Sequence, residues 1–232
     1  MKLEPIKVTA KMMTGQVATT DGYLPLDGIL AYVWVKENHP ELLEGDAGKA
    51  APIVVDHKLP IEKRGQGDDW YWACSFACYM PLKETRRYWH KRFDAQHAEE
   101  YVDFGNRRGK VNVRSAQYKN YRIPLNILLI PEIAWYLVGD KAEVERMVNQ
   151  ITHIGKKASQ GLGLVREWTV ESIDEDLSWL RPVPDENGDD YVGIRPPYWY
   201  HENFRKVRCP DDARLGARNL FITCQTRGIS QA

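Results

Sequence analysis

The chain has 232 residues, of which 43% are hydrophobic and 28% are charged, and its 32 basic and 32 acidic side chains cancel to a formal net charge of zero. This composition is typical of a globular protein with one sizeable core. No apolar run approaches the roughly 20 residues that a membrane-spanning helix requires, and the first residues (MKLEP) lack the apolar stretch of a signal peptide. We therefore expect a cytoplasmic protein that has no membrane partner.

The first 80 residues predict a strand, a helix and a second strand. Residues 6–13 (IKVTAKMM) alternate apolar and polar side chains, which indicates a strand. Residues 26–36 (LDGILAYVWVK) predict an apolar helix, with Asp27 near its start favouring the helix dipole. Residues 41–69 hold several glycines and are expected to be irregular. The aromatic run 70–80 (WYWACSFACYM) predicts a second, buried strand.

The four cysteines favour buried free thiols over a metal site. Cys74 and Cys78 would share one face of the predicted strand, and Cys209 and Cys224 are far from them in sequence. Zinc ligands usually come in closer pairs. We expect reduced cysteines, no metal and no cofactor.

The second half of the chain adds an insertion and three more predicted elements before a tail. Residues 83–94 (KETRRYWHKRFD) fit either an exposed β-ribbon arm or an amphipathic helix, and residues 95–124 complete the insertion. Apolar periodicity then predicts strands and a helix in the order strand 125–130, strand 133–138, helix 141–153 and strand 164–170. Three proline-containing clusters after residue 171 indicate a tail packed on the core.

Taken in order, these elements predict an α+β fold of the ferredoxin-like (RRM-like) βαββαβ type. The core would occupy residues 1–171 and carry a basic insertion at about 83–124. Residues 172–232 would form a C-terminal extension packed on that core.

A glycine-rich turn between the predicted second helix and last strand is the strongest chemical signal. It contains Gly155, Lys156, Lys157, Ser159, Gln160, Gly161 and Gly163. Glycines let a backbone approach a bulky ligand, and backbone N–H groups together with ammonium groups bind anions. The alternative is a tight helix-to-strand connection that needs positive φ. The spacing does not match a Walker A loop, so an NTPase is poorly supported.

Basic and acidic residues are concentrated in different parts of the sequence, although the formal net charge is zero. Between residues 105 and 122 six basic side chains occur without an acidic one, whereas residues 171–190 hold eight acidic side chains and one basic. The basic stretch includes Tyr118 and Tyr121, and aromatic rings among cations suit single-stranded RNA. The basic residues are Arg107, Arg108, Lys110, Arg114, Lys119 and Arg122. A solvated charged hairpin is the alternative, and residues 83–92 present a weaker version of the same pattern.

The element order and the motif Gly155-Lys156-Lys157-x-x-x-Gly161-x-Gly163-x-Val165, followed by Trp168, together resemble the RAMP superfamily of CRISPR proteins. Residues 26–32, 59–63 before 70–73, and 135–140 support the resemblance, which spans roughly residues 6–171. Within the superfamily the chain looks most like the Cas-five-type subunit of type IV CRISPR complexes.

The resemblance implies a non-catalytic subunit that binds the 5′ handle of the CRISPR RNA and caps a filament of backbone subunits in defence against foreign nucleic acid. Its partners would be the CRISPR RNA, the backbone (Cas-seven-type) subunits and a large or Cas-eight-like subunit, with target nucleic acid reached through the complex. Lys156 and Lys157 would contact phosphates, and Ser159 and Gln160 would bond a phosphate or a base edge.

Two other functions remain open from the residues. Some RAMP relatives cleave repeat RNA without metal, and histidine suits that proton transfer. The candidates are His57, His90, His97 and His153, but no pairing stands out in sequence, so we expect no catalytic residue. A ferredoxin-like module that binds a phosphate-bearing metabolite or another protein is the third possibility.

Overall fold

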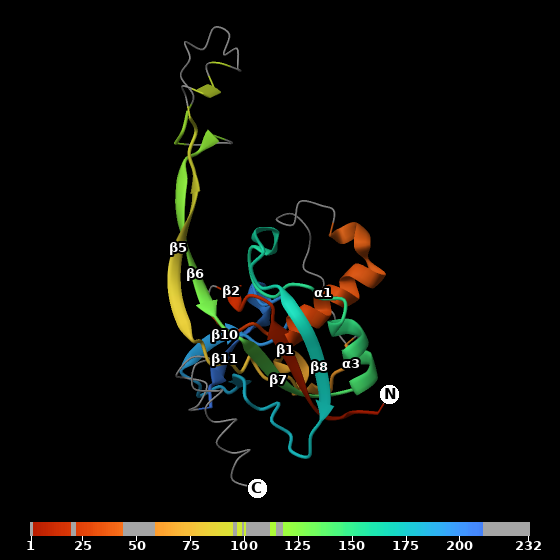
Figure 1. Ribbon diagram of the computed structural model, residues 1–232. Helices are drawn as coiled ribbons and strands as arrows, with labels where there is room; N and C mark the ends of the chain where they lie inside the picture. Colours follow the sequence, from red (N-terminus) through yellow and green to blue (C-terminus); the bar gives the residue numbers. More distant parts are fainter. Residues whose placement is uncertain are drawn as a thin grey trace.

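The computed structural model describes residues 2–19, 22–43, 59–94, 97–98, 100, 112–114 and 118–210. It is a mixed α+β structure built from several small antiparallel sheets (Figure 1). None of the helices in these ranges is long and apolar enough to cross a membrane.

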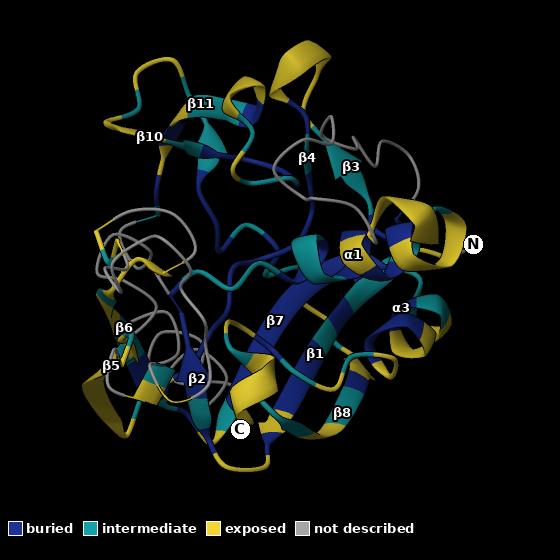
Figure 2. Cartoon of the chain, turned by 90° about the horizontal axis from the view of Figure 1, so that it is seen from above, coloured by how far each residue is buried: buried dark blue, intermediate teal, exposed yellow. Residues whose placement is uncertain are grey.

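The central sheet has the order β7-β1-β8. Strand β1 (Glu4–Met12) lies between β7 (Glu132–Gly139) and β8 (Val165–Ser172) and is antiparallel to both. The alternation predicted for residues 6–13 is present, since Ile6, Val8 and Ala10 are fully buried. Figure 2 shows the buried residues concentrated in β1 and β7. The predicted strands at 6–13, 133–138 and 164–170 are thus confirmed, and they form one sheet.

Helices α1 (Leu26–Asn38) and α3 (Lys141–Val148) pack into the same apolar core as the buried side chains of β1. Asp140 caps α3 by accepting a hydrogen bond from the backbone N–H of Glu143 (3.2 Å). Helix α3 ends five residues before the predicted limit of 153. The reason is pairing, because His153 forms a bridge with Leu164, which draws the chain out of the helix and toward β8.

The predicted strand over residues 70–80 is regular only at β4 (Tyr71–Trp72), which pairs with β3 (Lys63–Arg64). Beyond it, isolated bridges from Cys74 and Cys78 keep the segment antiparallel beside β7. Both cysteines are buried and neither forms a disulfide among the described residues, and Trp70 and Trp72 are core residues.

The cause of this irregularity is a pair of buried arginines from the C-terminal part. Arg195 donates to the carbonyl oxygens of Asp68 (2.7 Å) and Trp70 (2.9 Å). Arg181 donates to those of Trp72 (2.7 Å) and Cys74 (3.1 Å). Alternate carbonyls of this segment therefore bind guanidinium groups rather than a neighbouring strand.

Residues 83–94 form part of a β-ribbon and not an amphipathic helix. Strand β5 (Lys83–Lys91) pairs with β6 (Tyr121–Leu129), and β2 (Gln16–Ala18) pairs with the base of β6. Figure 1 shows β5 and β6 leaving the body as a long arm. Strand β6 starts four residues before the predicted 125, because Arg122 and Pro124 interrupt the apolar alternation that marks a strand in sequence.

The C-terminal part forms a third small sheet of order β10-β11-β9. Its strands are β9 (Val183–Pro184), β10 (Asp190–Gly193) and β11 (Phe204–Arg208). Leu180, Ile194 and Val207 pack against Cys78 and Tyr136 of the central part. Single 3₁₀ turns occur at Pro40–Leu42, Gly67–Asp69, Ala158–Gln160 and His201–Asn203. The predicted tail beyond residue 210 lies outside the described residues.

Arg181 also meets Asp27 inside the protein. Both side chains are 1% exposed, and the guanidinium Nη1 lies 3.5 Å from the carboxylate. Tyr198 donates to both carboxylate oxygens (2.8 Å each), while Arg181 Nη2 donates to the carbonyl oxygen of Ile194. Burial raises the pKa of the Asp27 carboxyl, and the charge of Arg181 and the hydroxyl of Tyr198 oppose that rise. Asp27 accepts from the first-turn N–H of Gly28 (2.9 Å), as expected for an acidic residue near the helix start, and it is also a buried ion-pair partner, which the sequence did not reveal.

Removing the Arg181 charge should lower the free energy of unfolding. Arg181→Met leaves the Asp27 carboxylate buried without its counter-charge, so we expect a loss of about 3–5 kcal/mol in the free energy of unfolding measured in urea. Asp27→Asn added to this variant should restore part of the loss. The control is Arg208→Met, because Arg208 is 67% exposed and its pair with Asp185 is worth at most about 1 kcal/mol. Equal stability of the Arg181 and Arg208 variants would contradict this view.

A second prediction concerns pH. Glu37 of α1 accepts hydrogen bonds from Arg146 (2.5 and 3.0 Å) and Gln150 (2.6 Å), and these lower its pKa from 4.5 to about 2. The pair therefore stabilises the fold above pH 4.5, and this contribution disappears as the pH falls toward 2. Because both side chains are partly solvated, Glu37→Gln should cost at most about 1 kcal/mol at pH 7. Urea titrations at pH 7 and pH 3 should show the difference shrinking; a constant difference would refute the assignment.

Candidate nucleic-acid interface

The glycine-rich turn, residues 154–164, is a loop with a fixed base and an open tip. At the base, the backbone N–H of Lys156 donates to Ala18 (2.8 Å), that of Gly163 donates to Gln16 (2.7 Å), and that of Ile154 donates to Gly163 (2.8 Å). The tip is the exposed 3₁₀ turn Ala158–Gln160. Strand β2 thus holds the loop at the side of the molecule from which the arm leaves (Figure 1).

The three glycines of the loop differ in how closely other backbone atoms approach them. Gly155 has φ +83°, and a Cβ there would lie 2.5 Å from the carbonyl oxygen of Ala18. Gly163 is buried with φ +73°, and its Cβ would meet the backbone of Ile154. Gly161 has φ +72° but faces open space. Close backbone packing therefore explains Gly155 and Gly163, and only Gly161 leaves the loop surface open for a ligand.

The two lysines of the loop also differ. Lys156 is exposed. Lys157 has the left-handed φ of 65°, and its ammonium lies 4.4 Å from the ring centroid of Trp89 in β5. Trp89 in turn donates its indole N–H to the hydroxyl of Tyr121 in β6 (3.0 Å). A cation–π contact thus connects the loop to the arm.

An apolar contact supports the same junction. Ala18, Ile127 and Leu162 form a small buried cluster, with Leu125 packed against it. These side chains come from β2, β6 and the loop. The arm is therefore fixed to the loop at its base.

Cations and rings continue along the arm. Arg122 places its guanidinium 3.9 Å from the ring centroid of Tyr88, across the pair of strands. In the described part of this region the exposed basic residues are Lys83, Arg86, Arg87, Lys91, Arg92, Arg114, Lys119 and Arg122. Strand β5 exposes most of its residues, and β6 exposes Arg122, Ile123 and Pro124 near its start (Figure 2). The ribbon thus presents the cation-and-ring pattern expected from its sequence.

The structure brings part of the predicted site together. The loop residues and Arg122 belong to one surface that runs from the loop tip along the arm. Arg107, Arg108 and Lys110 lie outside the described residues. The sequence did not reveal Trp89 and Tyr121 as the residues that link loop and arm, and it did not predict β2, because three residues are too few to show a strand period.

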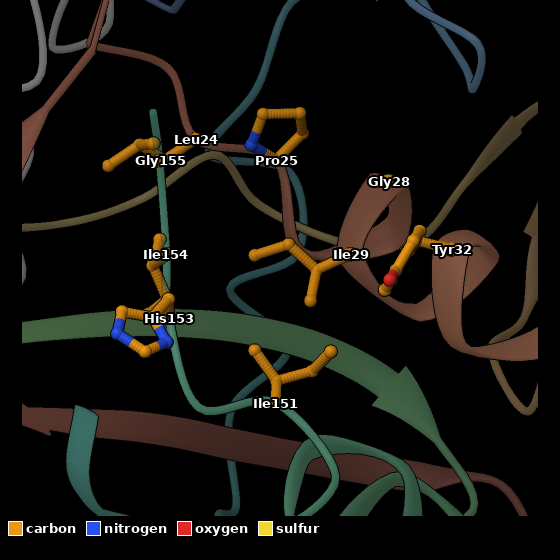
Figure 3. Close-up of a pocket in the computed structure, with 9 residues that line it drawn as sticks. All are labelled: Leu24, Pro25, Gly28, Ile29, Tyr32, Ile151, His153, Ile154 and Gly155. Carbon is orange, nitrogen blue, oxygen red and sulfur yellow. The ribbon is translucent and has the colours of Figure 1, made fainter. Parts of the chain in front are cut away.

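A cavity of about 340 Å³ lies beside the loop, between α1 and the segment that follows α3 (Figure 3). Its apolar walls include Ile29 and Ile151, and Tyr32, His153 and Gly155 also line it. His153 Nδ1 lies 2.9 Å from the hydroxyl of Thr152. The other histidine candidates are elsewhere: His90 is exposed on β5, His97 is exposed beyond it, and His57 lies outside the described residues.

Comparison with known families identifies the chain. A family model described as CRISPR type IV associated protein Csf3 matches residues 4–210. The chain belongs to this family. Csf3 is the Cas-five-like subunit of type IV systems, so the resemblance found in the sequence is confirmed. Membership makes the chain a subunit of a type IV CRISPR complex. No curated protein matches the chain at a significant level.

Over the described ranges of this Csf3 family member, no three His, Cys, Asp or Glu side chains gather in an arrangement that could hold a metal ion.

Substituting the loop glycines separates backbone strain from crowding. Gly155→Ala and Gly161→Ala both place alanine at positive φ, which costs about 1–2 kcal/mol. Only Gly155→Ala also forces a Cβ against the carbonyl oxygen of Ala18, so it should lower the thermal midpoint further than Gly161→Ala, the matched control. Equal thermal midpoints in differential scanning calorimetry would show that the base of the loop accommodates the added Cβ without loss of stability.

Proposed function

We propose that the chain is a non-catalytic RNA-binding subunit of a cytoplasmic type IV CRISPR ribonucleoprotein. It holds the 5′ handle of the CRISPR RNA and caps the backbone filament, in defence against foreign nucleic acid. The observation that carries this proposal is the contact of Lys157 with Trp89, which unites the glycine loop and the arm into one surface of cations and rings. A single-stranded RNA offers its phosphates to the cations and its bases to the aromatic rings.

The fold supports this proposal. In a ferredoxin-like core the fourth and third strands flank the first, and the second strand lies at the far edge of the third. Strands β8, β1 and β7 have this order, and residues 70–80 run beside β7 through the bridges of Cys74 and Cys78. We therefore propose a ferredoxin-like core over residues 1–171, with the arm as the insertion at 83–124 and residues 172–232 as the extension.

Within the loop, Lys156 contacts a phosphate directly, and Ser159 and Gln160 at the exposed tip bond a phosphate or a base edge. Lys157 contributes charge from its place over Trp89, and so also sets the angle between loop and arm. Gly163 is buried and supports the loop from below. The neighbours of this subunit are the backbone (Cas-seven-type) and large or Cas-eight-like subunits, and target nucleic acid is reached through the complex.

Neutralising Lys156 should weaken RNA binding and reduce its salt dependence. Lys156→Ala removes one phosphate contact, so the slope of log affinity against log salt should fall by about 0.7. Arg122→Ala should act in the same direction and also uncover Tyr88. The control is Lys206→Ala, because Lys206 is exposed on β11, and Figure 2 shows β11 far from β2, the strand that holds the loop.

The measurement is fluorescence anisotropy with the RNA that copurifies with the complex, at several salt concentrations. Sequencing of that RNA should show a repeat-derived 5′ end. Wild-type affinity and slope in the Lys156→Ala variant would remove the loop from the interface.

Repeat-RNA cleavage is the second candidate function, and one observation favours it. His153 lines the cavity beside the glycine loop, where an RNA phosphate would pass. Incubation of the protein with hairpin repeat RNA in a chelator, compared with His153→Ala, decides between the two. A product that depends on His153 would establish cleavage, and an intact RNA would leave the binding role alone.

A further inference from the structure

The cavity in Figure 3 has the properties of a site for a flat, mostly apolar group. It has a volume of about 340 Å³, within the range of small-molecule sites. Figure 3 shows Ile29 of α1 and Ile151 facing one another, with Tyr32 at one end and His153 at the other. Apart from the Tyr32 hydroxyl and the His153 imidazole, the labelled side chains carry no polar group.

The wall of the cavity includes part of the glycine loop. Gly155 is one of its lining residues, and the exposed Lys156 comes next in the chain. A charged phosphate is costly to bury among isoleucine and proline side chains, and it would instead stay at the Lys156 edge. A ligand that spans the two must therefore combine an anion with an uncharged ring.

We propose that this cavity receives one unstacked nucleobase of the bound RNA, whose phosphate lies against Lys156. The base packs between Ile29 and Ile151 and against the ring of Tyr32, which is 50% exposed. The Tyr32 hydroxyl and the His153 ring are placed to bond the edge of the base. This inference rests on the proposed RNA-binding function and adds to it a site that reads a base.

The test separates the base from the phosphate. The probes are a short single-stranded oligouridine and an abasic ribose-phosphate oligomer of the same length, both fluorescently labelled. Tyr32→Ala should weaken oligouridine binding about tenfold, in line with the loss of one stacked base. It should leave the abasic oligomer unaffected. Lys156→Ala should weaken binding to both probes.

Tyr191→Ala is the matched control, since Tyr191 is a 64% exposed tyrosine on β10 and should leave both affinities unchanged. Tyr32→Phe keeps the ring and loses only the hydroxyl, so it should weaken oligouridine binding less than Tyr32→Ala does. Circular dichroism and thermal midpoints confirm that the variants fold. Independently of any variant, 5-iodouridine in the wild-type complex should cross-link to the peptide that contains Tyr32.

The outcomes are distinct. Equal weakening of both probes by Tyr32→Ala, or no weakening together with no cross-link, overturns the base site. The RNA-binding function still stands in that case if Lys156→Ala weakens both probes. An unchanged RNA affinity with impaired assembly of the complex would mean that a partner subunit fills the cavity, which also overturns the proposal. No RNA binding by the wild-type protein overturns both proposals.

Discussion

The structure depends on two buried arginines that the C-terminal part contributes to the central part. Arg181 and Arg195 together bind four alternate carbonyl oxygens between Asp68 and Cys74. A buried carbonyl without a donor is costly, so these bonds stabilise the segment where its regular pairing with β3 is limited to Tyr71 and Trp72. The charge of Arg181 is balanced by Asp27 at the start of α1. One guanidinium therefore joins the helix, the edge segment and the C-terminal sheet.

Burying the Arg181–Asp27 ion pair costs free energy, and the polar atoms of the pair do not all have a hydrogen-bond partner. Among the described residues, Arg181 Nε is the one buried side-chain nitrogen or oxygen without a hydrogen-bond partner. Buried ion pairs seldom add stability over apolar packing, but they penalise any arrangement that separates them. The pair thus fixes where α1 lies relative to the C-terminal sheet. Because α1 also forms a wall of the cavity beside the glycine loop, the same pair positions the candidate site.

The candidate interface is assembled by contacts between segments far apart in sequence. Trp89 and Lys157 are separated in sequence by most of the arm, by β7 and by α3, yet they form a cation–π pair. The short strand β2 makes this possible, because it pairs with β6 on one side and bonds the loop backbone on the other. Arm and loop consequently share one base, and the surface that they form is continuous.

Local pattern was enough for the elements whose side chains alternate strongly. Residues 6–13 and 133–138 determined two strands, and the glycine-lysine motif together with the element order indicated the family. Short-range pattern could not reveal β2, the irregular edge segment or the early end of α3, because long-range partners decide them: β6, the two arginines and Leu164. Likewise, the sequence places Asp27 near the start of the helix, and only the fold brings Arg181 to it. Residue type and spacing therefore determined the chemistry that this chain carries, whereas tertiary pairing decided which cations face outward, which glycines are structural, and where the cavity beside the loop opens.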